Sequence, residues 1–201
     1  MKRGLALGGP ALGGLALGGV VGPVAFVGAW LTGSLTTSRD SSMIDDAISR
    51  LAAVGADSRP LMTAGFVCFG VALTAYALAV RDAVPGRSWI AAAATGVATL
   101  AVAALPLDHS DLVDRLHGVA AGIGYVTLAL TPALSVAPLR RLGATRLAAG
   151  AVVATTVSAI ALPLSLVTES TGLFQRVGLT ATDLWIVASV PAVRSRLSAT
   201  S

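Results

Sequence analysis

One carboxylate stands inside an otherwise apolar stretch of the sequence. Asp183 lies in the segment 179–185, whose other residues are apolar or hydroxyl-bearing. A carboxylate at this depth in a membrane helix costs several kcal/mol unless it is protonated, paired or hydrated, so it marks a site of function by default. Arg176 precedes it by two helical turns and is a candidate partner. Asp183 is therefore a candidate for proton handling, catalysis or ligand contact, with a structural ion pair or an interhelical hydrogen bond as the alternative.

Both histidines of the chain fall in residues 106–117, together with Asp108, Asp111 and Asp114. Asp114 and His117 are three residues apart and share a face if a helix begins there. An imidazole oriented by a carboxylate is typical of a general base or a ligand contact, and helix capping and packing are the alternatives. The close His or Cys spacing of a zinc site is missing, so we expect no metal.

Two further polar positions, Glu169 and Ser49, complete the set. A Gly-x-Ser-x-Gly element, a phosphate-binding loop and a dinucleotide fingerprint are all missing from the sequence, so we expect no cofactor. The candidate ligand-binding residues are Asp183, Arg176, His117, Asp108 and Ser49. The candidates for acid/base catalysis are Asp183, Glu169, His117 and Asp114.

The composition indicates that lipid surrounds the elements carrying these residues. Apolar residues make up 55% of the 201 positions and charged residues only 12%, and the mean hydropathy is +0.81. A soluble enzyme has about twice this share of charged residues. The single cysteine excludes a disulfide scaffold. We also expect no nucleic-acid partner, because the basic pI of about 10.2 comes from loops between apolar segments.

Six apolar segments are long enough to cross about 30 Å of hydrocarbon. The sequence predicts an all-α transmembrane bundle forming one domain over residues 1–201, and six crossings place both termini on the same side. Pro60 fits the first turn of the second helix, and Pro132 and Pro163 fall inside the fourth and fifth. The expected crossings are residues 12–36, 60–80, 88–106, 116–137, 147–167 and 177–193.

Positive charge predicts the orientation, since Lys and Arg are retained in the cytoplasm. Nine of the 14 Lys and Arg residues fall on the side of the termini, beginning with Lys2 and Arg3, and five fall on the other side. We therefore expect a multi-pass protein of the cell (inner or plasma) membrane with both termini cytoplasmic. A cleavable signal peptide at the start is the alternative.

The first outer loop and the first helix carry local patterns. Ile44, Ile48 and Leu51 recur at helical spacing after Ser42, which predicts a short amphipathic helix at about 43–54 on the outer membrane surface. A ridge of small residues lets another helix approach closely, either within the chain or in a homo-oligomer. This ridge consists of Gly14, Gly18 and Gly22.

Several short motifs occur along the chain, namely Ile48-Ser49-Arg50-Leu51, residues 60–66, Pro106-Leu107-Asp108, Leu116-His117-Gly118, residues 172–176 and Asp183-Leu184-Trp185. Together they resemble a six-helix bacterial membrane family, abundant in actinobacteria, that is catalogued as a domain of unknown function. The resemblance runs over nearly the whole chain and implies the topology, without an activity.

Because the candidate residues belong to the outer half of the chain, we expect a cavity open toward the outer leaflet. Membrane lipids are the expected surroundings. The first functional hypothesis is the binding of a lipid, an isoprenoid or another hydrophobic small molecule. The second is an intramembrane acid/base enzyme of the hydrolase or isoprenoid cyclase type, using Asp183, Glu169 and His117. The third is a transporter or an accessory membrane subunit.

Overall fold

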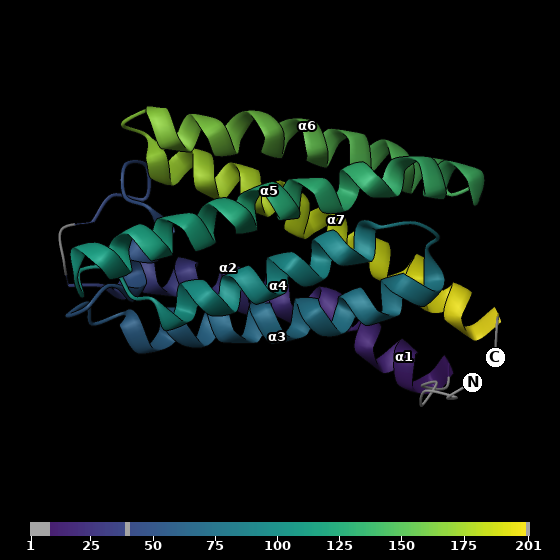
Figure 1. Ribbon diagram of the computed structural model, residues 1–201, viewed down its shortest axis with the longest axis horizontal. Helices are drawn as coiled ribbons and strands as arrows, with labels where there is room; N and C mark the ends of the chain where they lie inside the picture. Colours follow the sequence, from purple (N-terminus) through teal and green to yellow (C-terminus); the bar gives the residue numbers. More distant parts are fainter. Residues whose placement is uncertain (1–8, 39–40, 200–201) are drawn as a thin grey trace.

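Helices account for almost all of the chain in the computed structural model, which describes residues 9–38 and 41–199. Six long helical segments pack side by side, counting α1 and α2 as one segment interrupted at Leu17 (Figure 1). A short 3-10 helix, η1, lies in the loop between α2 and α3. The elements are α1 (Gly9–Ala16), α2 (Gly18–Thr36), η1 (Ile48–Ala52), α3 (Arg59–Ala83), α4 (Ser88–Ala104), α5 (Asp111–Arg141), α6 (Thr145–Val167) and α7 (Thr171–Ala199).

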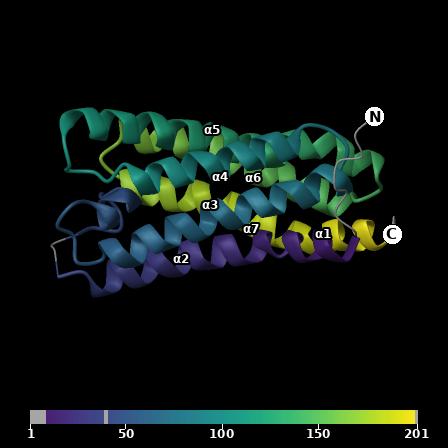
Figure 2. The ribbon, with the colours of Figure 1, turned by 60° about the horizontal axis from the view of Figure 1, so that its bottom comes forward.

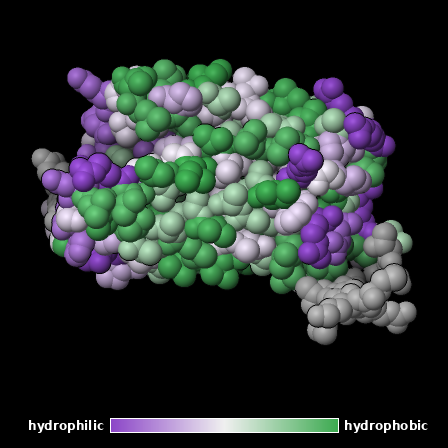
Figure 3. Space-filling view, in the orientation of Figure 1, coloured by the Kyte–Doolittle hydropathy of each residue, from purple (hydrophilic) through white to green (hydrophobic). Residues whose placement is uncertain are grey.

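The all-α bundle expected from the apolar segments is confirmed. Four helices are long and apolar enough to cross a membrane, and they span Ala11–Thr36, Arg59–Ala83, Asp111–Arg141 and Thr145–Val167. The surface agrees with this, because apolar side chains cover the middle of the bundle and polar ones gather at its two ends (Figure 3). Side chains that face outward at mid-bundle include Val97, Val126 and Leu184, each at least 60% exposed. The protein is therefore a membrane protein.

The two ends of the bundle differ in what they hold. The start of α1 and the end of α7 lie at the same end, which also holds the α3–α4 and α5–α6 turns (Figures 1 and 2). The opposite end, called here the loop end, holds the connections α2–α3, α4–α5 and α6–α7. Three of the charges used for the orientation, Lys2, Arg3 and Arg39, lie outside the described residues.

Small residues allow α2 to approach α3 closely. A Cβ placed at Gly18 would overlap the carbonyl of Ala72, and one at Gly22 would lie 3.2 Å from the Ala72 Cβ. Gly14 has open space around it. The glycine ridge therefore serves a contact within the chain at two of its three positions. Homo-oligomerisation through the ridge stays a prediction, and only Gly14 is free to take part.

Buried hydroxyl groups join the helices. Tyr76 of α3 and Ser189 of α7 share a hydrogen bond of 2.5 Å, and Ser158 of α6 is 2.8 Å from the Thr182 hydroxyl of α7. Lipid offers such groups no partner, so they pair with one another across helix interfaces. Pro60 lies in the first turn of α3 as expected, and Pro132 and Pro163 lie inside α5 and α6.

The loop between α2 and α3 differs from the amphipathic helix expected at 43–54. Ser42 does begin a turn, since its hydroxyl accepts from the amide of Asp45 at 3.1 Å, but only the 3-10 helix η1 follows. Carbonyl groups that would accept hydrogen bonds within an α-helix here accept them from helix α7. Arg176 donates to the carbonyls of Met43 and Asp46, and the Leu173 amide donates to that of Ile44. The segment is thus packed into the bundle, and Ile48 and Leu51 are buried.

Candidate functional site

A cavity of about 60 Å³ lies inside the bundle toward the loop end. Helices α2, α3, α4, α5 and α7 all contribute to its wall, and η1 contributes Ile48 and Ser49. Three of the residues singled out from the sequence meet here, namely Asp183, His117 and Ser49. They come from three elements that are far apart in the chain, so the fold creates the site.

Asp183 enters this cavity wall from α7 without a partner. Its side chain is 2% exposed, and neither carboxylate oxygen has a hydrogen-bond partner among the described residues. Burying a carboxylate without donors or a counter-charge carries a large desolvation cost. Packing alone does not offset this cost for the Asp183 carboxylate. A hydrogen-bond donor or a cation in contact with the carboxylate would stabilise it.

His117 lines the same cavity from α5 and is 4% exposed. Its Nδ1 lies 2.6 Å from the carbonyl oxygen of Leu105 at the end of α4. A carbonyl can only accept, so Nδ1 carries the proton, and in the neutral ring Nε2 is then an acceptor. Nε2 is buried without a partner in the described chain. A backbone carbonyl orients this imidazole, in place of the expected Asp114.

Gln175 is a wall residue that the sequence reasoning missed. It is 5% exposed, and its Oε1 accepts a hydrogen bond of 3.0 Å from the Ile48 amide, which fixes η1 over the cavity. Its position follows a simple pattern. Gln175, Leu179 and Asp183 are spaced by four residues, so they share one face of α7, and all three line the cavity.

Aromatic rings form much of the remaining wall. Phe26 of α2 lies 5.7 Å from Phe66 and 5.3 Å from Phe69, measured between ring centroids. Tyr125 of α5 borders the cavity and also an apolar groove of about 380 Å³ between α5 and α6. The polar atoms of Asp183 and His117 thus lie in a largely apolar chamber beside a groove that opens on the lipid-facing surface.

Arg176 does not pair with Asp183, contrary to the sequence expectation. Its Nη1 donates to the carbonyl oxygens of Met43 at 2.8 Å and Asp46 at 3.0 Å, and its guanidinium carbon lies 5.3 Å from the ring centroid of Trp30. The side chain borders a separate polar cavity of about 120 Å³ under the α2–α3 loop. Arg176 therefore fastens the loop to α7.

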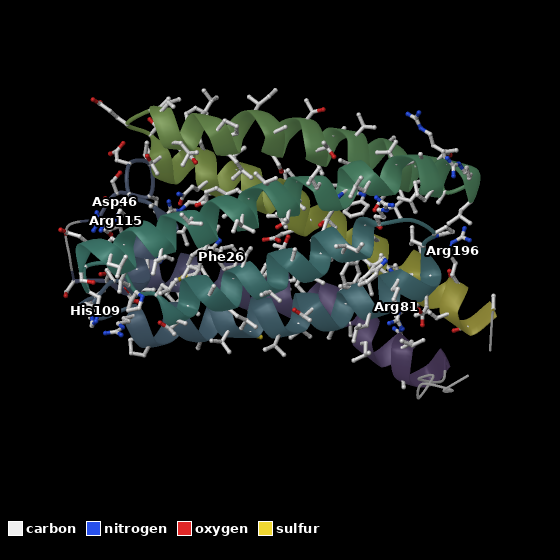
Figure 4. The ribbon with its side chains drawn as sticks, in the orientation of Figure 1. Phe26, Asp46, Arg81, His109, Arg115 and Arg196 are labelled. Atoms are coloured by element: carbon white, nitrogen blue, oxygen red, sulfur yellow. The ribbon has the colours of Figure 1, made fainter. Side chains whose placement is uncertain are left out.

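The other candidates lie around the loop end, outside the wall of the Asp183 cavity. Asp108 forms an exposed ion pair of 2.8 Å with Arg50, and Asp114 accepts from the Asp108 amide at 3.0 Å. Glu169 is exposed in the α6–α7 connection. Figure 4 shows this end through Asp46, His109 and Arg115, with Phe26 deeper in the bundle and Arg81 and Arg196 at the opposite end.

Metal-binding groups do not gather anywhere in residues 9–38 and 41–199. These residues contain no cluster of three His, Cys, Asp or Glu side chains that could hold an ion. The single cysteine, Cys68, is a free, half-buried thiol. The polar groups of the cavity wall are the Asp183 carboxylate, the His117 imidazole, the Gln175 amide and the hydroxyls of Ser49, Thr95, Thr99 and Tyr125.

Comparison with known proteins places the chain in a family. The model of the family described as a protein of unknown function (DUF998) matches residues 20–190, a range that includes every residue named in the cavity wall. No curated protein and no solved structure matches the chain. The match covers most of the sequence and agrees with the resemblance found in its motifs, so the chain belongs to the DUF998 family.

Proposed function

We propose that this membrane protein binds a hydrophobic small molecule, such as a lipid or an isoprenoid, with the polar end of the ligand in the Asp183 cavity. One observation carries the proposal. Asp183 and His117 line the same enclosed space, and both carboxylate oxygens and the imidazole Nε2 are buried without partners in the described chain. Native proteins satisfy the great majority of buried polar groups, so three orphans at one cavity indicate a missing partner.

The surroundings of the cavity fit an apolar ligand. Phe26, Phe66 and Phe69 supply apolar contact area, and Tyr125 connects the cavity wall to the groove between α5 and α6. Ligand sites are commonly apolar chambers with a few convergent polar groups. A chain lying in the groove would bring its end past Tyr125 toward Asp183.

Binding is better supported than acid/base catalysis. An enzyme of the kind considered would bring a second acid to Asp183, and Glu169 is exposed in the α6–α7 connection, outside the cavity wall. Asp114 is also engaged elsewhere, by the Asp108 amide. The ligand-contact residues in this proposal are Asp183 and His117, with Ser49 and Gln175 at the side of η1.

We place the protein in the cell (inner or plasma) membrane, with the termini in the cytoplasm and the cavity toward the outer leaflet. This orientation follows from the excess of Arg at the end that holds the α3–α4 and α5–α6 turns. At that end lie Arg81, Arg87, Arg140, Arg141, Arg146, Arg194 and Arg196.

The test is native mass spectrometry of the protein in a mild detergent, comparing wild type with a cavity-filling variant. Gly124 lines the cavity, and Gly124→Leu would fill part of it. Gly118 lies on the same helix with nothing within 4 Å of a Cβ, so Gly118→Leu is the matched control. We expect a bound mass in wild type and in Gly118→Leu, and its loss in Gly124→Leu.

Two results would count against the proposal. A ligand-free mass for wild-type protein taken directly from membranes is one. A bound mass that survives Gly124→Leu at the wild-type level is the other, since it would place the ligand elsewhere on the surface.

A further inference from the structure

The orphan atoms at the cavity all require the same kind of partner. Asp183 offers two carboxylate oxygens, and His117 offers Nε2, which accepts in the neutral ring because Nδ1 donates to the Leu105 carbonyl. With Asp183 ionised and the ring neutral, all three are acceptors. The Thr95 and Thr99 hydroxyls donate within α4 and toward Thr127, and no described residue donates a hydrogen bond to Asp183 or to Nε2 of His117. The missing group is therefore a hydrogen-bond donor.

A charge is missing as well. Neither lysine nor arginine lines the cavity among the described residues. The nearest candidate in sequence, Arg176, is held away by the carbonyls of Met43 and Asp46 and by the face of Trp30. A buried carboxylate needs either a proton or a cation. The described residues bring neither a lysine nor an arginine to Asp183.

The rest of the wall suits a cation carried by an apolar body. Phe26, Phe66, Phe69 and Tyr125 line the same space. Aromatic faces attract ammonium groups through the ring quadrupole, and this attraction grows when water is excluded. An anion would be repelled there by the Asp183 carboxylate. A neutral alcohol could donate one hydrogen bond, whereas an alkylammonium donates three and also neutralises the carboxylate.

We propose that the cavity takes the protonated amino group of an apolar amine, with Asp183 as its counter-ion and His117 Nε2 as a second acceptor. This inference rests on the proposed function, because it names the chemical class of the ligand for the same cavity. The apolar part of the amine lies along the aromatic wall toward Tyr125.

The experiment compares three ligands that share one chain and differ in their polar group, namely hexylamine, hexanol and hexanoate. Binding to the purified protein in a mild detergent is measured by calorimetry or ligand-observed NMR at neutral pH, where an alkylamine is protonated as lysine is. For wild type we expect hexylamine to bind at least about tenfold more tightly than hexanol, the size of effect that a charge-assisted hydrogen bond gives. Hexanoate should not bind.

Two variants locate the effect. Asp183→Asn keeps the shape of the side chain but removes the charge, so it should bring hexylamine affinity down to that of hexanol while hexanol binding stays. Asp82→Asn is the matched control, because Asp82 is exposed and pairs with Arg81 at the other end of the bundle. Asp82→Asn should bind hexylamine as tightly as wild type does. Partition of the amine into the detergent affects both proteins equally, so this control corrects for it.

The outcomes separate this inference from the proposed function. Hexanol binding as tightly as hexylamine, or hexylamine binding equally well to Asp183→Asn, would overturn the amine inference and leave the cavity as a ligand site. If none of the three ligands binds wild type, the proposed function fails with it. The wild-type comparison alone decides between amine and alcohol, so the test stands even if Asp183→Asn does not fold.

Discussion

His117 Nδ1 lies 2.6 Å from the carbonyl oxygen of Leu105, and this bond joins the first turns of α5 to the end of α4. It determines which nitrogen of the ring carries the proton. The other nitrogen, Nε2, is left as an acceptor at the Asp183 cavity. In His117, Nδ1 thus contributes to the fold and Nε2 is available to a ligand. Substitutions can separate the effect of each nitrogen on stability and on binding.

The first prediction uses this separation. In His117→Asn the side-chain amide can still donate to the Leu105 carbonyl, so the free energy of unfolding should change little, while ligand binding weakens because Nε2 is gone. His117→Ala removes both atoms and should cost about 1–3 kcal/mol of stability as well. Reversible unfolding in detergent and native mass spectrometry measure the two effects. Equal stability of the two variants would show that the bond to Leu105 contributes nothing.

The second prediction concerns Gly172 at the start of α7. A Cβ there would lie 2.7 Å from the Met43 carbonyl oxygen and closer still to that of Asp46. Gly172→Ala should therefore push the α2–α3 loop off α7 and lower the free energy of unfolding by about 1–3 kcal/mol, as overpacking does. Hydrogen exchange of residues 43–48 should rise with it.

Gly118→Ala provides the control for this prediction. A Cβ at Gly118 meets nothing within 4 Å, so alanine should stabilise α5 slightly through its better helix propensity. Propensity alone predicts stabilisation at both glycines. A stabilising Gly172→Ala would therefore contradict the close approach of the loop to α7.

The third prediction follows from Asp57, which fastens the end of α2 to the start of α3. Its carboxylate accepts from the Ser38 hydroxyl and amide, the Thr37 hydroxyl and the Ser58 amide. These bonds, those from Ser38 first, hold the pKa of Asp57 well below its usual range. A depressed folded-state pKa contributes stability above the unfolded pKa of about 4, and this stability is lost as the pH falls toward the folded pKa.

Asp57→Asn should therefore destabilise the α2–α3 connection at neutral pH, and the difference from wild type should shrink as the pH is lowered below about 4. Hydrogen exchange at the Ser38 and Ser58 amides, followed against pH, measures this locally. A difference that is constant with pH would mean that the charge of Asp57 contributes nothing and that only its shape matters.

The helices of the bundle could be predicted from the sequence because long apolar segments form helices in a membrane, and four of the six expected crossings are long and apolar enough to span one. The expected segments differ from the observed helices by a few residues at most ends, and Pro60 occupies the first turn of α3 as its ring geometry requires. The loop between α2 and α3 could not be predicted in this way. Its local helix signal at Ser42 is real, but Arg176 and Leu173 compete for its carbonyls from far along the chain.

The candidate site shows the same division. Asp183 was conspicuous because charge is rare in a membrane helix, and His117 because imidazoles are few. The partner chosen for Asp183 was wrong, since Arg176 has nearer carbonyls to bind. Gln175 shares a helix face with Asp183 and lines the cavity, but a neutral amide next to an arginine gives no distinctive signal in the sequence. Spacing along α7 was a better guide than charge.

The last prediction tests the orientation of the bundle in the membrane. Replacing the single cysteine, Cys68→Ala, gives a background in which one new thiol can be labelled. His109 is exposed at the loop end and Arg141 at the opposite end, so His109→Cys and Arg141→Cys report the two sides. In intact cells a membrane-impermeant maleimide should label His109→Cys, because the excess of Arg keeps the other end in the cytoplasm. Arg141→Cys should be labelled only after the cells are opened, and the reverse pattern would turn the Asp183 cavity toward the inner leaflet.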